Sequence, residues 1–189
     1  MLFRIITRKA MLQTSVVLST LGVGMGGVSD IVDLRGVHER QGEYPMRDMK
    51  KVDTIVFHHT ATTAQGWGSI NDFHRVIRKW SAIGYHFGAS WDARVFQHND
   101  IDRRTNHCGG CNTRTVGFAF LGNYDTVEAS HELLSKVEGW TRFVMELYPN
   151  ITKIKYHGEL VATRCPGTNV ITWVKDFRVR LAYEKQFPI

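Results

Sequence analysis

Residues 55–61 read Ile-Val-Phe-His-His-Thr-Ala, and the prediction of the fold starts from this stretch. β-Branched and aromatic side chains dominate the run from Val52 to His58, which is typical of a short buried strand. Two adjacent histidines lie at the end of this run: His58 is its last residue, and His59 follows it. Because strand ends project side chains into the clefts of α/β sheets, we expect a functional site where this strand ends.

Candidate strands and helices alternate along the rest of the chain. Ile70, Phe73, Ile77 and Trp80 recur at helical spacing, with Ser69 as a candidate N-cap. The remaining patterns predict a hairpin at 85–91 and 94–97, strands at 116–121 and 151–156, helices at 133–147 and 170–183, and loops at 98–115 and 157–168. This interleaving predicts an α/β fold, a single domain with a central mixed β-sheet covered by helices.

The composition fits one globular domain. The 189 residues are 43% hydrophobic and 22% charged, with only 4 Pro, which excludes intrinsic disorder and low-complexity fibres. Three cysteines are too few, and odd in number, for a disulfide framework. The net charge is +6, and half of it comes from Arg4, Arg8 and Lys9. The rest of the chain is only mildly basic, so we expect no nucleic-acid partner.

The chain divides into three parts. Residues 1–28 have a basic start, a weakly apolar middle and a Gly-rich end, which is the outline of a secretory signal. A docking arm that binds a partner or a membrane is the alternative. Polar residues dilute this segment, so it makes a poor transmembrane helix. Residues 29–50 are a polar, irregular lead-in, and residues 51–189 are the domain itself.

Histidine and cysteine side chains gather at two places. His58 and His59 end the first strand, and His157 and Cys165 lie eight residues apart across a loop. Imidazole nitrogen and thiolate sulfur are ligands that zinc prefers, and three protein ligands with an open fourth position make a catalytic site. On spacing alone, ordinary buried or solvated roles for these residues stay open.

Four segments resemble the motifs of the zinc-dependent N-acetylmuramoyl-L-alanine amidases of the type-2 family, which includes amidase-type phage lysozymes and peptidoglycan recognition proteins. They occur in the family's order within residues 51–170. The segments are Ile55 to Ala61, Gly84 to Phe87, Thr115 to Asn123, and His157 to Gly167. The resemblance implies the family's fold, Zn2+ as cofactor and peptidoglycan as partner.

Position by position, the resemblance implies that His58, His157 and Cys165 bind the zinc ion. His59 then packs or hydrogen-bonds on the other side of the strand, because neighbouring strand residues point to opposite faces. Tyr85 matches the family's catalytic tyrosine, which would orient the attacking water or stabilise the oxyanion. A core tyrosine is the alternative for Tyr85.

The resemblance also assigns residues around the cleft. Thr163 occupies a catalytic position where phage lysozymes carry lysine; its hydroxyl can donate a hydrogen bond but brings no charge. His107 and Asn112 fall where the family contacts substrate, with an ordinary polar loop role as the alternative. Cys108 and Cys111 depart from the family's pattern. We expect them to form a local disulfide, with free thiols or a second metal site as alternatives.

The expected activity is hydrolysis of the amide bond between N-acetylmuramic acid and L-alanine in peptidoglycan, in cell-wall lysis or remodelling, for example by a phage endolysin or a virion-associated lysin. The protein would act on the cell wall, in the periplasm, outside the cell or on a virion. One alternative is a non-catalytic module that binds peptidoglycan. Others are a peptidase that cuts a different wall bond, and a virion or envelope component whose amidase acts locally.

Overall fold

The structure is a computed structural model that describes residues 31–63 and 66–187. Within these residues, six strands form one mixed sheet in the order β1-β4-β3-β5-β2-β6. The strands are β1 (Ile31–Asp33), β2 (Thr54–His59), β3 (Phe87–Ala89), β4 (Val95–Gln97), β5 (Thr115–Phe120) and β6 (Lys153–Tyr156). Only β3 and β4 pair antiparallel, as the predicted hairpin, and the other pairings are parallel.

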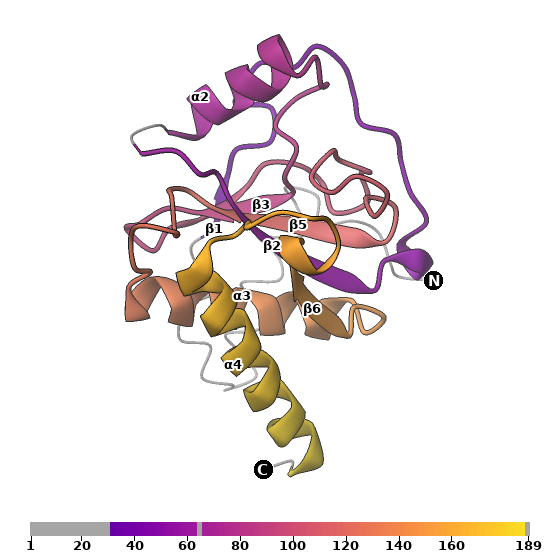
Figure 1. The fold of residues 1–189 in the computed structure, drawn as a ribbon. Helices are drawn as coiled ribbons and strands as arrows, with labels where there is room; N and C mark the ends of the chain where they lie inside the picture. Colours follow the sequence, from indigo (N-terminus) through magenta and orange to yellow (C-terminus); the bar gives the residue numbers. More distant parts are fainter. Residues whose placement is uncertain (1–30, 64–65, 188–189) are drawn as a thin grey trace.

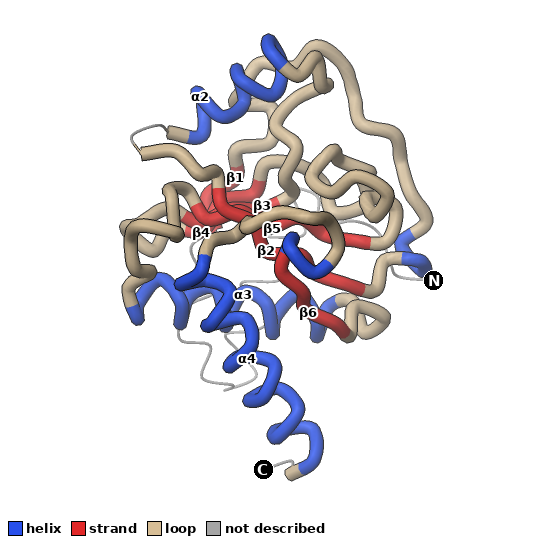
Figure 2. The backbone as a smooth tube through the Cα atoms, viewed as in Figure 1, coloured by secondary structure: helices blue, strands red, loops and turns tan. Residues whose placement is uncertain are grey.

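Helices cover both faces of the sheet (Figures 1 and 2). The helix α2 (Trp67–Asp72), extended by a π-helical turn at Phe73–Ile77, lies on one side. The helices α3 (His131–Leu147) and α4 (Thr168–Gln186) lie on the other. This arrangement confirms the predicted α/β architecture. None of the helices among the described residues is long and apolar enough to cross a membrane.

The alternation of side chains along β2 divides the core into two layers. Ile55 and Phe57 point toward α3 and α4, where they join a large cluster that includes Trp140 and Trp173. His58 follows Phe57 and therefore points to the opposite face, the side of α2. A smaller apolar cluster lies on that side, made of Trp67, Ile70, Ile83, Phe96, Ala119 and Leu121. The face of α2 is thus the face on which a site at His58 is built.

The first helix differs from its prediction in both its start and its buried face. It begins at Trp67 after Gly66 as N-cap, so the prediction of Ser69 as N-cap was wrong. Phe73 and Ile77 were expected inside but are exposed. The buried positions on their turn of helix are polar residues with tertiary partners, which hydrophobicity patterns do not detect. Asn71 accepts a hydrogen bond from the Ile83 N–H, and His74 accepts one from the Gly84 N–H.

The lead-in at residues 29–50 is more regular than its composition indicated. It contributes β1, which pairs with β4 at the edge of the sheet, and a short helical turn begins at Met49. Tyr44 within it is buried, and its hydroxyl donates to the Ala82 carbonyl. The predicted signal or docking arm at residues 1–28 lies outside the described residues.

Gly88 on β3 tests how tightly α2 packs on the sheet. A Cβ at Gly88 would lie 2.4 Å from the Trp67 ring and 3.0 Å from the Ala119 carbonyl oxygen. We expect Gly88→Ala to lower the free energy of unfolding by about 1–3 kcal/mol through overpacking. Urea denaturation followed by tryptophan fluorescence measures this change.

Gly139 on α3 provides the matched control. Its Cβ would meet nothing within 4 Å, and alanine is favoured over glycine in a helix by roughly 1 kcal/mol. Gly139→Ala should therefore be neutral or stabilising in the same measurement. An equal, small effect of both substitutions would contradict the close packing of Trp67 on β3.

Candidate metal centre

Three side chains from separate segments converge at one end of β2. His58 is the fifth residue of β2, His157 opens a short helical turn (His157–Glu159) directly after β6, and Cys165 lies in the loop before α4. Their nitrogen and sulfur atoms all lie within 4.8 Å of one another. The parallel strands β2 and β6 explain the pairing of the histidines. Phe57 lies opposite Tyr156, so the next residue of each strand is a histidine, and the two rings are 4.4 Å apart.

Backbone contacts hold Cys165 beside the two histidines. The Gly158 N–H donates to the Cys165 carbonyl, at 3.0 Å, which closes the loop. The Cys165 N–H donates to the Thr163 hydroxyl, at 3.2 Å, and the His59 N–H points at the Cys165 sulfur, at 3.4 Å. A side chain at Gly158 would collide with the Thr163 carbonyl, because a Cβ there would lie 2.6 Å from it. The loop therefore presents the sulfur toward His58.

The spacing of these donors suits a zinc ion. Zinc bonds of about 2.0–2.3 Å in a tetrahedron place ligand atoms roughly 3.3–3.6 Å apart. The Cys165 Sγ and the His58 Nδ1 are 3.8 Å apart, so a shift of a few tenths of an ångström would bring both to bonding distance. Two imidazoles and one thiol are also the donor types that zinc prefers. The residues present therefore fit the metal.

Burial sets the protonation of the three donors. His58 is 1% exposed, and burial together with the neighbouring histidines lowers its pKa well below the ordinary value. Burial also lowers the pKa of His157. Both imidazoles are thus neutral at pH 7, the form that binds metals. Burial raises the pKa of the Cys165 thiol to about 12, so a metal that binds there must displace its proton.

His59 points away from the three donors, as predicted from its place next to His58. The Tyr124 N–H donates to its Nδ1, at 3.2 Å, on the side of α3 and α4. This bond occupies one of the two ring nitrogens of His59. Because side chains alternate along β2, only His58 of the two adjacent histidines faces His157 and Cys165.

Tyr85 lies against the same site. Its ring is 5.4 Å from the His58 ring and 5.4 Å from the His74 ring. Burial, helped by the nearby Cys165, raises the pKa of Tyr85 above its usual range, so the phenol keeps its proton at neutral pH. The hydrogen bonds among the described residues include none to its hydroxyl, which stays available as a donor.

The family of the chain follows from sequence comparison. Residues 48–168 match the family described as N-acetylmuramoyl-L-alanine amidase. The chain belongs to this family. The match spans the whole converging site, from the lead-in through Cys165, and it confirms the resemblance drawn from the four motifs.

Individual relatives agree with this membership. Peptidoglycan-recognition protein SC1a of Drosophila melanogaster is 30% identical over 132 residues, which are 61% of this chain and 68% of that protein. The N-acetylmuramoyl-L-alanine amidase of Mus musculus is 33% identical over 113 residues, 58% of this chain but 21% of that protein. Among solved structures, the endolysine N-acetylmuramoyl-L-alanine amidase LysCS from Clostridium intestinale URNW is similar with a TM-score of 0.70. It is 26% identical, and the match covers 84% of this chain and 99% of that one.

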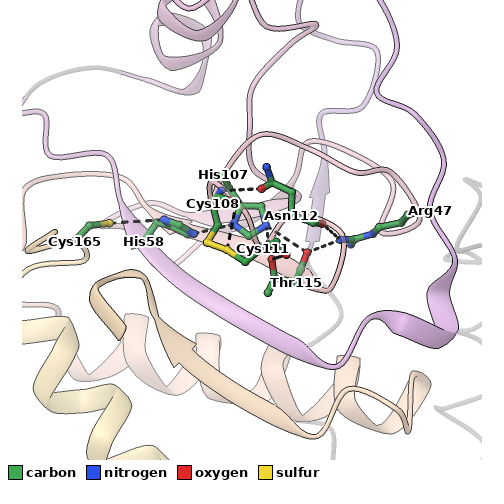
Figure 3. Close-up of a disulfide and its surroundings, with 8 residues drawn as sticks. All are labelled: Arg47, His58, His107, Cys108, Cys111, Asn112, Thr115 and Cys165. Atoms are coloured by element: carbon green, nitrogen blue, oxygen red, sulfur yellow. Dashed lines mark hydrogen bonds between the residues drawn. A yellow bond between two sulfur atoms is a disulfide. The ribbon is translucent and has the colours of Figure 1, made fainter. Parts of the chain in front are cut away.

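Two of the residues expected in the cleft of this amidase-family chain have structural partners. Thr163 is exposed, and its hydroxyl accepts the Cys165 N–H. The amide oxygen of Asn112 accepts the Cys108 N–H, at 2.8 Å. Cys108 and Cys111 form the predicted local disulfide, which closes this loop (Figure 3).

His107, the other residue expected to contact substrate, lies next to His58. The residue is 6% exposed, and its Nδ1 lies 3.0 Å from the Nε2 of His58. Its other nitrogen faces Thr115. Burial lowers the pKa of His107 to about 3, so the ring is neutral. Both ring nitrogens of His107 thus have partners inside the protein.

No sequence pattern pointed to Arg47, a buried cation in the lead-in. Its guanidinium donates to the backbone carbonyls of Ile101, Asn112 and Thr115, which ties the loop 98–115 to β5 (Figure 3). Burial lowers the pKa of Arg47 to about 10, against the opposing charge of Asp102, so it stays charged at neutral pH. In the sequence, a single buried arginine in a polar segment looks the same as an arginine exposed to solvent.

Removal of the Arg47 guanidinium should destabilise this loop. Arg47→Met leaves the Ile101 and Asn112 carbonyls without this donor and removes one of the two donors near the Thr115 carbonyl. Each unsatisfied group costs about 1–3 kcal/mol. We expect the free energy of unfolding to fall by roughly 3 kcal/mol or more. As control, Arg114→Met removes an exposed arginine paired with Asp53 and should cost about 0–1 kcal/mol. Equal losses in urea denaturation would contradict the role of Arg47.

Proposed function

We propose that the protein hydrolyses the amide bond between N-acetylmuramic acid and L-alanine in peptidoglycan, with Zn2+ bound by His58, His157 and Cys165. The observation that carries this proposal is the complete set of two imidazoles and one thiol at one sheet edge, with a protonated tyrosine beside it. Membership of the N-acetylmuramoyl-L-alanine amidase family supports the same reaction. The amidase names of the mouse and Clostridium relatives agree with it.

A zinc ion in this site would supply Lewis-acid chemistry, which activates a water molecule and polarises the scissile carbonyl. The chain's own residues hold it in a fixed place. The buried, neutral His58 offers Nδ1 on the side of Cys165, and the closed loop from Gly158 to Cys165 holds the sulfur opposite. Both ligands would need to move by only a few tenths of an ångström when the metal binds.

Polar groups beside the three metal donors would act on the substrate. The Tyr85 hydroxyl keeps its proton and is available to donate a hydrogen bond to the oxyanion that develops at the carbonyl. Thr163 accepts the Cys165 N–H through its oxygen, which leaves its own proton for a substrate oxygen. The Asn112 amide oxygen is occupied by Cys108, so Asn112 would bind the stem peptide or sugar through its amide N–H groups.

A non-catalytic peptidoglycan-binding module is the second candidate, and the recognition-protein relatives favour it. Binding alone needs a cleft and not a metal centre. The presence of all three donors together with Tyr85 supports the hydrolase over the binding module.

Digestion of purified peptidoglycan tests the proposal. The intact protein should release stem peptides that begin with L-alanine, as identified by mass spectrometry of the new ends. Treatment with a chelator should abolish the release and added zinc should restore it, because the activity depends on the metal. Cys165→Ala should be inactive under all these conditions.

A control and two contrary outcomes complete this test. Val179→Ala changes an exposed residue far along α4 and should leave the release unchanged. Binding of peptidoglycan without any cleavage would identify a recognition module. Cleavage at another bond, seen as peptides that do not begin with L-alanine, would identify a peptidase.

Tyr85→Phe separates catalysis from packing. The substitution keeps the ring against His58 and His74 but removes the hydroxyl. We expect kcat/KM to fall about 10²–10³-fold, the usual effect of losing one oxyanion donor, with the zinc affinity unchanged. Unchanged kcat/KM would assign Tyr85 to the core instead.

The place of action follows from the substrate. A protein with this activity acts on the cell wall, in the periplasm, outside the cell or on a virion. Residues 1–28 would serve as a secretory signal or as a docking arm. Sequencing the N-terminus of the mature protein distinguishes the two, because a signal is removed and an arm is retained.

A further inference from the structure

A chain of hydrogen bonds runs from the donor set into the protein through His107 (Figure 3). His58 has Nδ1 on the side of Cys165 and Nε2 on the side of His107, 3.0 Å from its Nδ1. The opposite nitrogen of His107, Nε2, lies 3.1 Å from the Thr115 hydroxyl and 3.3 Å from the Thr115 carbonyl oxygen. The Thr115 hydroxyl in turn donates to the Cys111 carbonyl, at 2.8 Å.

The direction of every bond in this chain is determined from its far end. A carbonyl oxygen can only accept, so the Thr115 hydroxyl donates its single proton to Cys111. The His107 Nε2 faces that hydroxyl and a second carbonyl, so it must be the protonated nitrogen. In a neutral imidazole the other nitrogen is then an acceptor. The Nδ1 of His107 therefore accepts from the Nε2–H of His58, and the His58 Nδ1 is left without a proton.

A glycine on the sheet determines where the His107 ring can lie. A Cβ at Gly117 on β5 would lie 2.4 Å from the ring, so only glycine allows the ring to lie against the strand. The neighbouring loop is fixed as well, by the Cys108–Cys111 disulfide and by the Asn112 oxygen on the Cys108 N–H. Arg47 adds donors to the Asn112 and Thr115 carbonyls. Gly117 and the fixed loop thus hold the ring against β5.

We propose that His107 is a positioning residue that holds His58 in the tautomer and orientation that present Nδ1 to the metal. This inference rests on the proposed zinc centre. A partner on the second nitrogen of a ligating histidine fixes its tautomer, and its loss typically lowers metal affinity 10–100-fold. His107 thus acts through His58 and does not contact the substrate.

The test measures the zinc affinity of the purified protein by competition with a chromophoric chelator, and it needs no substrate. His107→Leu removes the acceptor for the His58 Nε2–H and should weaken zinc binding about 10–100-fold. His107→Asn carries a side-chain oxygen near the position of Nδ1 and should restore most of this affinity. The spectrum of bound Co2+ should change for His107→Leu and resemble the parent's for His107→Asn.

A purely structural role is distinguished by a matched variant. Gly88→Ala destabilises the same face of the sheet at a place without contact to the hydrogen-bond chain, and it should keep the parent's zinc affinity. If Gly88→Ala weakens zinc binding as much as His107→Leu does, general destabilisation explains the loss and the inference is overturned. NMR of the metal-free parent should also find His58 protonated on Nε2; protonation on Nδ1 would contradict the chain.

The proposed zinc centre and the role of His107 fail in different ways. A parent protein that binds no zinc overturns both. A parent that binds zinc tightly, with His107→Leu equally tight, overturns only the role of His107 and leaves the zinc amidase proposal intact.

Discussion

The parallel register between β2 and β6 is the constraint on which the site depends. Phe57 pairs with Tyr156, so His58 and His157 leave the sheet side by side. A shift of β2 by one residue would turn every side chain to the other face of the sheet. Phe57 would then lie on the polar face, and His58 would be buried among aromatic rings. The large cluster around Phe57 and Trp173 opposes such a shift. Core packing on one face therefore determines which histidine meets Cys165 on the other.

Polar contacts, more than apolar ones, hold the loop that faces this site. The loop 98–115 lacks a long apolar run, and the buried cation Arg47 and the buried imidazole His86 replace it. His86 accepts the Gly117 N–H at Nδ1, and its Nε2 lies 2.8 Å from the Arg103 carbonyl. Buried polar groups are costly without partners, and once paired they define a single arrangement. The fixed loop thereby holds His107 in place, and His107 in turn contacts His58.

The predictable part of the molecule is the part governed by hydrophobic pattern. The run before His58, the hairpin and the helix of α3 could be recognised because burial of apolar side chains dominates them. The polar part of the buried face of α2 and its π-helical extension could not, since Asn71 and His74 are inside because they form hydrogen bonds with residues 83 and 84. The resemblance to the family motifs predicted the set of His58, His157 and Cys165, which the structure places together. The motifs also suggested a substrate contact at His107, whose burial depends on a glycine of the next strand, Gly117.

The two sides of His58 bear on the choice between catalysis and recognition. On one side lie Tyr85, whose hydroxyl is available as a donor, and the exposed Thr163; a binding protein could use both without a metal. On the other side, the chain through His107 to Thr115 has one consequence, an unprotonated Nδ1 aimed at Cys165. A metal ion binds an unprotonated imidazole nitrogen, so this proton arrangement is the one that suits the proposed zinc centre. The buried half of the site thus supports the proposed zinc centre, on which the proposed hydrolysis depends.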